Sequence, residues 1–199
     1  MRRPGSALLL AASLAAAWPA WAWEPDARAQ QVLARGGRYV DVRPDGPGAS
    51  GLVRAAIDVA APPKVVFQVL ADCRLAPRMA PRLESCLVLE RDPAGRWDVR
   101  EHVSRAGLIP SLRSVFRSDF DPPRSITFQA LGGDLPRFEG AWRVVELPAG
   151  AGSRVYYESR VTLPFRTPGP WARMTLRRDV VRALAALRRE SLARAGQRG

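Results

Sequence analysis

The chain has 199 residues, 31 basic and 19 acidic, and a net charge of +12 at neutral pH. This length fits one domain with a buried core. The charge would suit nucleic acid or an anionic surface, but no aromatic-basic nucleic-acid motif accompanies it, so nucleic acid is not expected as a partner. Only one of the basic residues is a lysine, Lys64, and codon bias in a GC-rich genome explains that preference without any partner.

Residues 1–22 predict a cleavable signal peptide. Two arginines open the segment, residues 6–17 are an apolar run rich in Ala and Leu, and Ala20 and Ala22 place small residues where signal peptidase needs them. The run is shorter than the roughly 20 residues of a membrane span, and Pro19 breaks it. An uncleaved anchor remains the alternative. We therefore expect cleavage after Ala22, a periplasmic or secreted location, and a mature net charge of +10.

The chain contains two cysteines, Cys73 and Cys86. An even number of cysteines in an oxidising compartment favours a disulfide. A metal pair or a redox pair is the alternative, but the spacing is not CxxC and no histidine lies nearby in the sequence. We expect a Cys73–Cys86 disulfide.

Three units are expected along the chain: the signal peptide, an N-terminal helix with its connector over 23–51, and one domain over 52–195. The helix is predicted over 24–35 and the Pro/Gly-rich connector over 44–50. The domain is expected to contain a strand over 52–59, a helix that begins at 61–63 and a short helix over 75–83. After these come strands over 86–91, 97–104, 112–121, 125–131, 138–147 and 154–163, and then a long helix over 170–194.

Consecutive strands joined by short turns predict an antiparallel meander. The strands alternate apolar and polar residues, so the sheet has one apolar face, and only the last helix is long enough to cover it. The residues expected to share the apolar face of that helix are Met174, Val180, Val181, Leu184 and Leu187. The predicted class is α+β: a curved antiparallel sheet of about seven strands wrapped around a long C-terminal helix, with two short helices after the first strand.

Two stretches resemble a known superfamily. Residues 53–72 (VRAAIDVAAPPKVVFQVLAD) resemble the opening of START-like domains, the SRPBCC or helix-grip superfamily. Residues 138–147 and 153–163 (FEGAWRVVEL and SRVYYESRVTL) are similar to the late strands of its polyketide-cyclase and coenzyme-Q-binding branch. The resemblance covers roughly 52–194. It implies the helix-grip fold and a tunnel for an apolar ligand, and little about the ligand or any chemistry.

Strand alternation sorts the side chains onto two faces. The candidate ligand contacts, all expected on the concave face, are Glu101, Phe116, Phe128, Phe138, Trp142, Tyr157 and Ser159. A carboxylate inside a cavity is costly unless paired, so Glu101 is the best candidate for orienting a ligand. The alternative is that Glu101 lies near the cavity mouth or pairs with an arginine of the C-terminal helix. Asp98, Arg100 and His102 are placed on the solvated outer face, together with Arg117 and Arg160.

No catalytic residue, metal site or cofactor is assigned, because the single histidine is placed outside and no phosphate-binding loop is present. The residues favour a noncatalytic exported carrier for an apolar small molecule such as a lipid, a quinone or a polyketide-like compound. An aromatase/cyclase-like enzyme is one alternative, and a membrane-associated interaction module with a filled core is another. Weak contact with anionic membranes is also expected. The sequence does not decide the oligomeric state.

Overall fold

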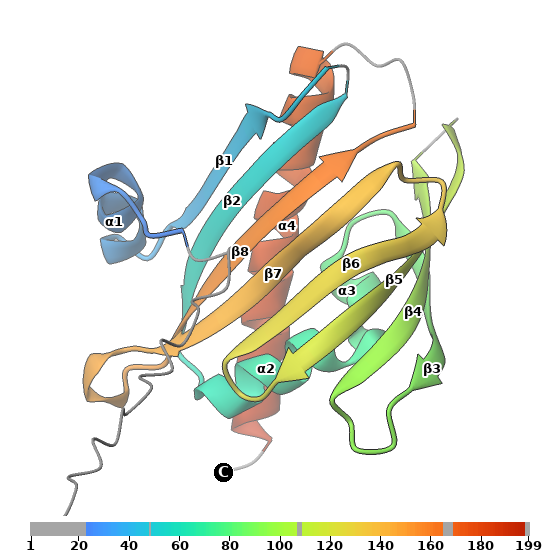
Figure 1. Ribbon diagram of the computed structural model, residues 1–199. Coiled ribbons are helices and arrows are strands. Elements are labelled where there is room, and N and C mark those ends of the chain that lie inside the picture. Colours follow the sequence, from blue (N-terminus) through green and yellow to red (C-terminus); the bar gives the residue numbers. More distant parts are fainter. Residues whose placement is uncertain (1–22, 48, 107–108, 165–168, 198–199) are drawn as a thin grey trace, which may run out of the picture.

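The computed structural model describes residues 23–47, 49–106, 109–164 and 169–197. Over these residues the chain forms one antiparallel sheet of eight strands, and the long helix α4 crosses behind it (Figure 1). The order of the strands is β1-β2-β8-β7-β6-β5-β4-β3. This arrangement confirms the predicted helix-grip class. The expected signal peptide, 1–22, lies outside the described residues.

The elements follow the predicted order. The strands are β1 (Arg38–Pro44), β2 (Ser50–Val59), β3 (Leu83–Arg91), β4 (Trp97–Ala106), β5 (Ile109–Asp121), β6 (Ser125–Gly133), β7 (Arg137–Glu146) and β8 (Ser153–Thr162). The helices are α1 (Ala27–Ala34), α2 (Pro63–Ala71), α3 (Ala76–Met79) and α4 (Gly169–Gly196), with short 3₁₀ turns at Cys73–Leu75 and Pro148–Gly150. Strand β1 was not expected, and it raises the sheet from about seven strands to eight.

Helix α1 begins at a capping aspartate and packs on the outer face of the sheet. The side chain of Asp26 caps its N-terminus, accepting a hydrogen bond of 2.8 Å from the amide of Ala29. Leu33 of α1 packs with Ala56 of β2 and Tyr156 of β8. The residues next to Ala56 and Tyr156 in their strands point to the opposite face of the sheet, where the main core lies. Helix α1 therefore covers part of the outer face of the sheet.

The main core lies between the other face of the sheet and helices α2 and α4. Its fully buried members include the alternating residues of β2 that were predicted to share a face, Val53, Ala55, Ile57 and Val59. Helix α4 contributes Val180, Leu184 and Leu187 of its predicted apolar face as buried residues, and the partly buried Val181 packs against them. Met174 is 45% exposed, so its predicted burial is wrong.

The two cysteines form a disulfide. Cys73 lies in the 3₁₀ turn after α2 and Cys86 in the edge strand β3, and their Cα atoms are 5.5 Å apart. The bond confirms the predicted pairing and ties the helical segment to the strand that ends the sheet.

Among the helices of the described residues, none combines the length and the apolar character that a membrane span requires.

Candidate functional site

A cavity of about 270 Å³ lies between the concave face of the sheet, the α3 segment and α4. Its volume is near the lower end of the roughly 300–1,000 Å³ usual for small-molecule sites. The residues that line it are Leu70, Ala76, Met79, Ala80, Pro81, Leu83, Arg100, His102, Phe116, Ser118, Ile126, Phe128, Phe138, Trp142, Tyr157, Asp179, Val180, Ala183 and Leu187. Most of these side chains are apolar, as in sites that bind apolar small molecules.

One wall of the cavity is aromatic, and we call it the aromatic wall: Phe116, Phe128, Phe138, Trp142 and Tyr157. The ring centroids of Trp142 and Tyr157 are 4.2 Å apart, and those of Phe128 and Phe138 are 4.8 Å apart. Favourable aromatic pairs have centroids about 4.5–7 Å apart, so the Phe128–Phe138 pair lies within this range and the Trp142–Tyr157 pair is slightly closer. All five residues were candidate ligand contacts in the sequence, and the fold brings them together around one space.

The position of Phe128 depends on a glycine. Phe128 of β6 pairs directly with Gly140 of β7. A Cβ atom at Gly140 would collide with the Phe128 ring and with the backbone of Glu158 and Ser159 in β8. Glycine is therefore required at position 140, because any larger residue would collide both with the Phe128 ring and with the backbone of β8.

Ser159 and Tyr157 both point to the concave face, but only Tyr157 lines the cavity. Ser159 is buried, and its side chain hydrogen-bonds with Tyr157. Burial raises the pKa of the Tyr157 phenol, and this hydrogen bond offsets part of the rise. Ser159 therefore restrains the position of the Tyr157 phenol through this hydrogen bond.

Strand β4 faces the opposite way from the prediction. Arg100 pairs across the sheet with the inward Phe116, and directly opposed residues share a face. Arg100 and His102 consequently line the cavity. Glu101 points outward and forms an ion pair with Arg113, whose side chain is half exposed. The predicted inward position of Glu101 is wrong. Trp97 lies on the same outer face of β4, and the Arg117 guanidinium lies over its ring.

The physical reason is an ion pair within the strand. The Nε and Nη2 atoms of Arg100 lie 2.7 and 2.9 Å from the two carboxylate oxygens of Asp98. Nη2 also donates to the backbone carbonyl of Ala71 at 2.6 Å. The prediction placed Asp98 and Arg100 outside because an unpaired buried charge is costly. Asp98 and Arg100 compensate each other, so that cost is reduced. In the sequence, the feature that could have indicated this buried ion pair was the spacing of an aspartate and an arginine two residues apart.

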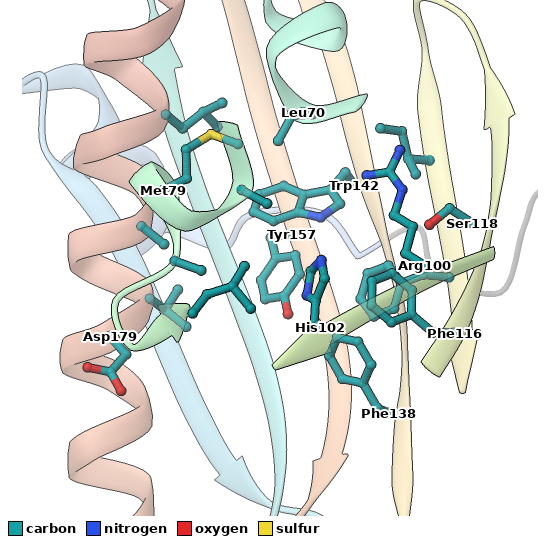
Figure 2. A pocket seen from close by; sticks show the side chains of 18 of the residues that line it. Leu70, Met79, Arg100, His102, Phe116, Ser118, Phe138, Trp142, Tyr157 and Asp179 are labelled. Carbon is teal, nitrogen blue, oxygen red and sulfur yellow. The ribbon is translucent and has the colours of Figure 1, made fainter. Parts of the chain in front are cut away.

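His102 carries a polar atom without a partner. Its ring packs edge-on against Phe116, with centroids 4.7 Å apart. Its Nε2 atom is buried and makes no hydrogen bond within the described residues. Burial, and after it the charge of Arg100, lower the pKa of His102 to about 4. The imidazole is therefore neutral at pH 7, and Figure 2 shows it directed into the cavity beside the labelled aromatic residues.

The opposite side of the cavity carries one carboxylate. Asp179 of α4 lies 3.3 Å from Nε of Arg82, in the segment between α3 and β3. Burial raises the pKa of Asp179 above its usual value.

The outer-face positions of Arg117 and Arg160 are confirmed, since they pair with Asp119 and Asp45. Within the part of the chain that the structure describes, no three metal-ligating side chains gather as a metal site would require.

Several solved structures are similar to this chain. A protein from Thermus thermophilus is 27% identical, with 71% of this chain and 97% of that chain covered and a TM-score of 0.60. An aromatase/cyclase from Streptomyces sp. R1128 is 22% identical, with 75% and 95% covered and a TM-score of 0.58. A STAR-related lipid transfer protein from Xanthomonas axonopodis is 18% identical, with 86% and 98% covered and a TM-score of 0.66. The last two likenesses show the shared fold alone. No curated protein sequence matches the chain.

A family model described as polyketide cyclase/dehydrase and lipid transport matches residues 59–188. The matched stretch runs from the end of β2 into α4 and includes every residue that lines the cavity. It also covers well over half of the chain. By this match, and by the helix-grip fold that it shares with its structural neighbours, the chain belongs to the polyketide cyclase/dehydrase and lipid transport family.

Proposed function

We propose that this protein is an exported, noncatalytic carrier that holds an apolar small molecule in the cavity. The observation that carries the proposal is the aromatic wall bordering a space of about 270 Å³. Such a space would be filled by side chains if the domain served only as an interaction module. Lipids, quinones and polyketide-like compounds have the apolar surface that this wall would bury.

A carrier is favoured over an enzyme by the state of the polar groups. Asp98 forms an ion pair with Arg100, and Asp179 forms an ion pair with Arg82. With a pKa of about 4, His102 is a weak base at neutral pH, whereas a general base works best with a pKa near the operating pH. These groups suit binding and orientation better than proton transfer.

The location of the protein is part of the proposal. The signal-like character of residues 1–22 and the Cys73–Cys86 disulfide both support an oxidising compartment. Expression of the full chain in a bacterial host, followed by fractionation and mass measurement, tests this step. A periplasmic protein that starts at Trp23 is expected. A cytoplasmic protein that keeps residues 1–22 would contradict export.

A second surface supports collection of the ligand at a membrane. A groove beside the cavity lies between α3 and α4, shares Met79 and Pro81 with the cavity, and is bordered by Arg78, Arg182 and Arg189. Basic residues gathered near a lipid-binding cavity favour contact with anionic headgroups. The groove would place the cavity next to the bilayer that supplies the ligand.

Binding of a neutral fluorescent probe, N-phenyl-1-naphthylamine, tests the carrier function. Ala183 of α4 lines the cavity, and Ala183→Trp would fill it. Ala193→Trp, at an exposed position of the same helix, is the matched control. We expect the wild type and the control to bind the probe and Ala183→Trp to lose binding with an unchanged circular dichroism spectrum. Equal binding by all three would refute the proposal.

A further inference from the structure

The cavity has a polar side as well as the aromatic wall. Arg100 and His102 of β4 and Ser118 of β5 line one side, whereas β6, β7 and β8 contribute aromatic and aliphatic side chains. Figure 2 shows Arg100 and Ser118 together on one side, with Asp179 of α4 across the cavity. A ligand that fits both sides needs a largely apolar body and a polar group at one place.

The charges of the polar side are already balanced. Asp98 is 1% exposed and Arg100 is 6% exposed, and two hydrogen bonds join them. Arg100 also donates to the Ala71 carbonyl. Across the cavity, Asp179 has Arg82 as its partner. A ligand carboxylate or phosphate would therefore enter without a free cation to neutralise it, which makes its desolvation costly.

Among the described residues that line the cavity, the buried side-chain atom without a hydrogen-bond partner is Nε2 of His102. Buried polar atoms are nearly always hydrogen-bonded, so a buried ring nitrogen that lacks a partner and borders a cavity calls for one from a ligand. The imidazole is uncharged at neutral pH. A neutral ring nitrogen can donate or accept according to its tautomer, so an alcohol or a carbonyl oxygen can serve.

The shape of the aromatic wall points to a flat ligand. The rings of Phe128 and Tyr157 are nearly parallel, with an angle of 18° between their planes, and Trp142 lies tilted against Tyr157. Flat faces of this kind favour stacking with another planar group. The small volume of the cavity, about 270 Å³, excludes a lipid with two acyl chains.

We infer that the ligand is a small, uncharged, planar molecule whose single carbonyl or hydroxyl oxygen hydrogen-bonds to Nε2 of His102 while its apolar body lies on the aromatic wall. The inference rests on the proposed carrier function and narrows its ligand class. It excludes fatty acids, phospholipids and other lipids with charged groups as the preferred cargo.

Four naphthalenes of similar shape test the inference by calorimetry or tryptophan fluorescence: 2-acetylnaphthalene, 1-(2-naphthyl)ethanol, 2-isopropylnaphthalene and 2-naphthoate. For the wild type we expect the ketone or the alcohol to bind about fivefold more tightly than 2-isopropylnaphthalene, the factor that one net hydrogen bond supplies. We also expect it to bind more tightly than the carboxylate, whose charge must be desolvated without a counter-charge. Tightest binding of 2-naphthoate would overturn the inference.

Two variants identify the hydrogen-bonding group. His102→Phe keeps the ring contact with Phe116 but removes Nε2, so it should weaken the preferred oxygenated probe about fivefold and leave 2-isopropylnaphthalene unaffected. His102→Gln restores a polar group and should recover part of the loss. Equal loss for both probes would contradict the inference. If His102→Phe fails to fold, the ketone-to-carboxylate ratio of the wild type still decides.

The two proposals fail in different ways. If 2-isopropylnaphthalene binds and the oxygenated probes gain nothing from His102, the carrier function stands and the ligand class is wrong. If none of the four probes binds the wild type, the carrier function itself is wrong, and the inference falls with it.

Discussion

Asp98 and Arg100 lie two residues apart on β4 and form an almost fully buried ion pair on the side of the cavity, with 2.7 Å between Arg100 Nε and Asp98 Oδ1. The neighbouring strand repeats the spacing on its outer face. There Arg117 and Asp119 form an ion pair of 2.8 Å that is exposed to solvent. One pattern of side chains thus occurs in two environments, which separates the effect of burial from that of charge.

Asp98→Asn should destabilise the domain by about 3–5 kcal/mol, because it leaves the buried guanidinium of Arg100 without its counter-charge. Urea denaturation followed by circular dichroism measures the change in the free energy of unfolding. Asp119→Asn is the control, and no measurable change is expected for it. A similar loss of stability in both variants would show that the Asp98–Arg100 pair is not specially important.

His102 should make the stability depend on pH. Its pKa falls from 6.5 to about 4 on folding, so between these values the unfolded chain binds a proton that the folded chain does not. Stability therefore decreases as the pH falls, by about 2 kcal/mol at pH 5 and about 3 kcal/mol at pH 4 from this group alone.

The comparison of His102→Gln with the wild type isolates that contribution, because the chain contains one histidine. The free energy of unfolding of the wild type should fall more steeply than that of the variant between pH 7 and pH 5. Parallel pH profiles for the two proteins would mean that His102 titrates normally and is not buried against the cavity.

The disulfide should stabilise the domain through the unfolded state. Cys73 and Cys86 are 13 residues apart, and closing a loop of this length contributes about 3 kcal/mol in the chain-entropy model. Replacement of both cysteines by serine should lower the stability by about that amount. Reduction with dithiothreitol should lower the stability of the wild type alone. An effect of the reductant on the double variant would indicate another cause.

We expect contact with anionic membranes to depend on the groove between α3 and α4. Replacement of Arg78, Arg182 and Arg189 by glutamine should abolish sedimentation with phosphatidylglycerol vesicles at low salt, since each basic residue near such a surface contributes about 1 kcal/mol. Binding of the wild type should fade at high salt.

A second triple variant controls for net charge in that experiment. Arg28, Arg35 and Arg38 are exposed on and beside α1, which packs on the outer face of the sheet. Their replacement by glutamine lowers the charge equally but should leave vesicle binding largely intact. Equal losses in the two variants would show a nonspecific charge effect in place of a docking surface.

The sequence predicted most of the fold because its local signals agree with one another. Alternation located the strands of the meander, Pro63 marked the start of α2, and the two cysteines paired as expected. Strand β1 escaped prediction because only Val40 and Val42 are regularly spaced apolar residues in it. Its place at the edge of the sheet, paired only with β2, requires fewer buried positions.

The candidate site was predictable where hydrophobicity decides the face of a strand. The aromatic wall was found on that basis. Strand β4 was misassigned because the face with Trp97 and Val99 is the more apolar of its two faces, although it points outward. Its orientation is determined by pairing with β5, which places Arg100 opposite Phe116. Mutual compensation of Asp98 and Arg100 is a tertiary effect that alternation alone does not reveal.

Native mass spectrometry of the protein purified from a bacterial periplasm tests the carrier function most directly. The wild type should retain a bound small molecule of a few hundred daltons, which organic solvent releases. Ala183→Trp should show the mass of the bare chain, because its cavity is filled. A wild type that carries no additional mass, or a bound mass that Ala183→Trp keeps unchanged, would contradict a ligand in the cavity.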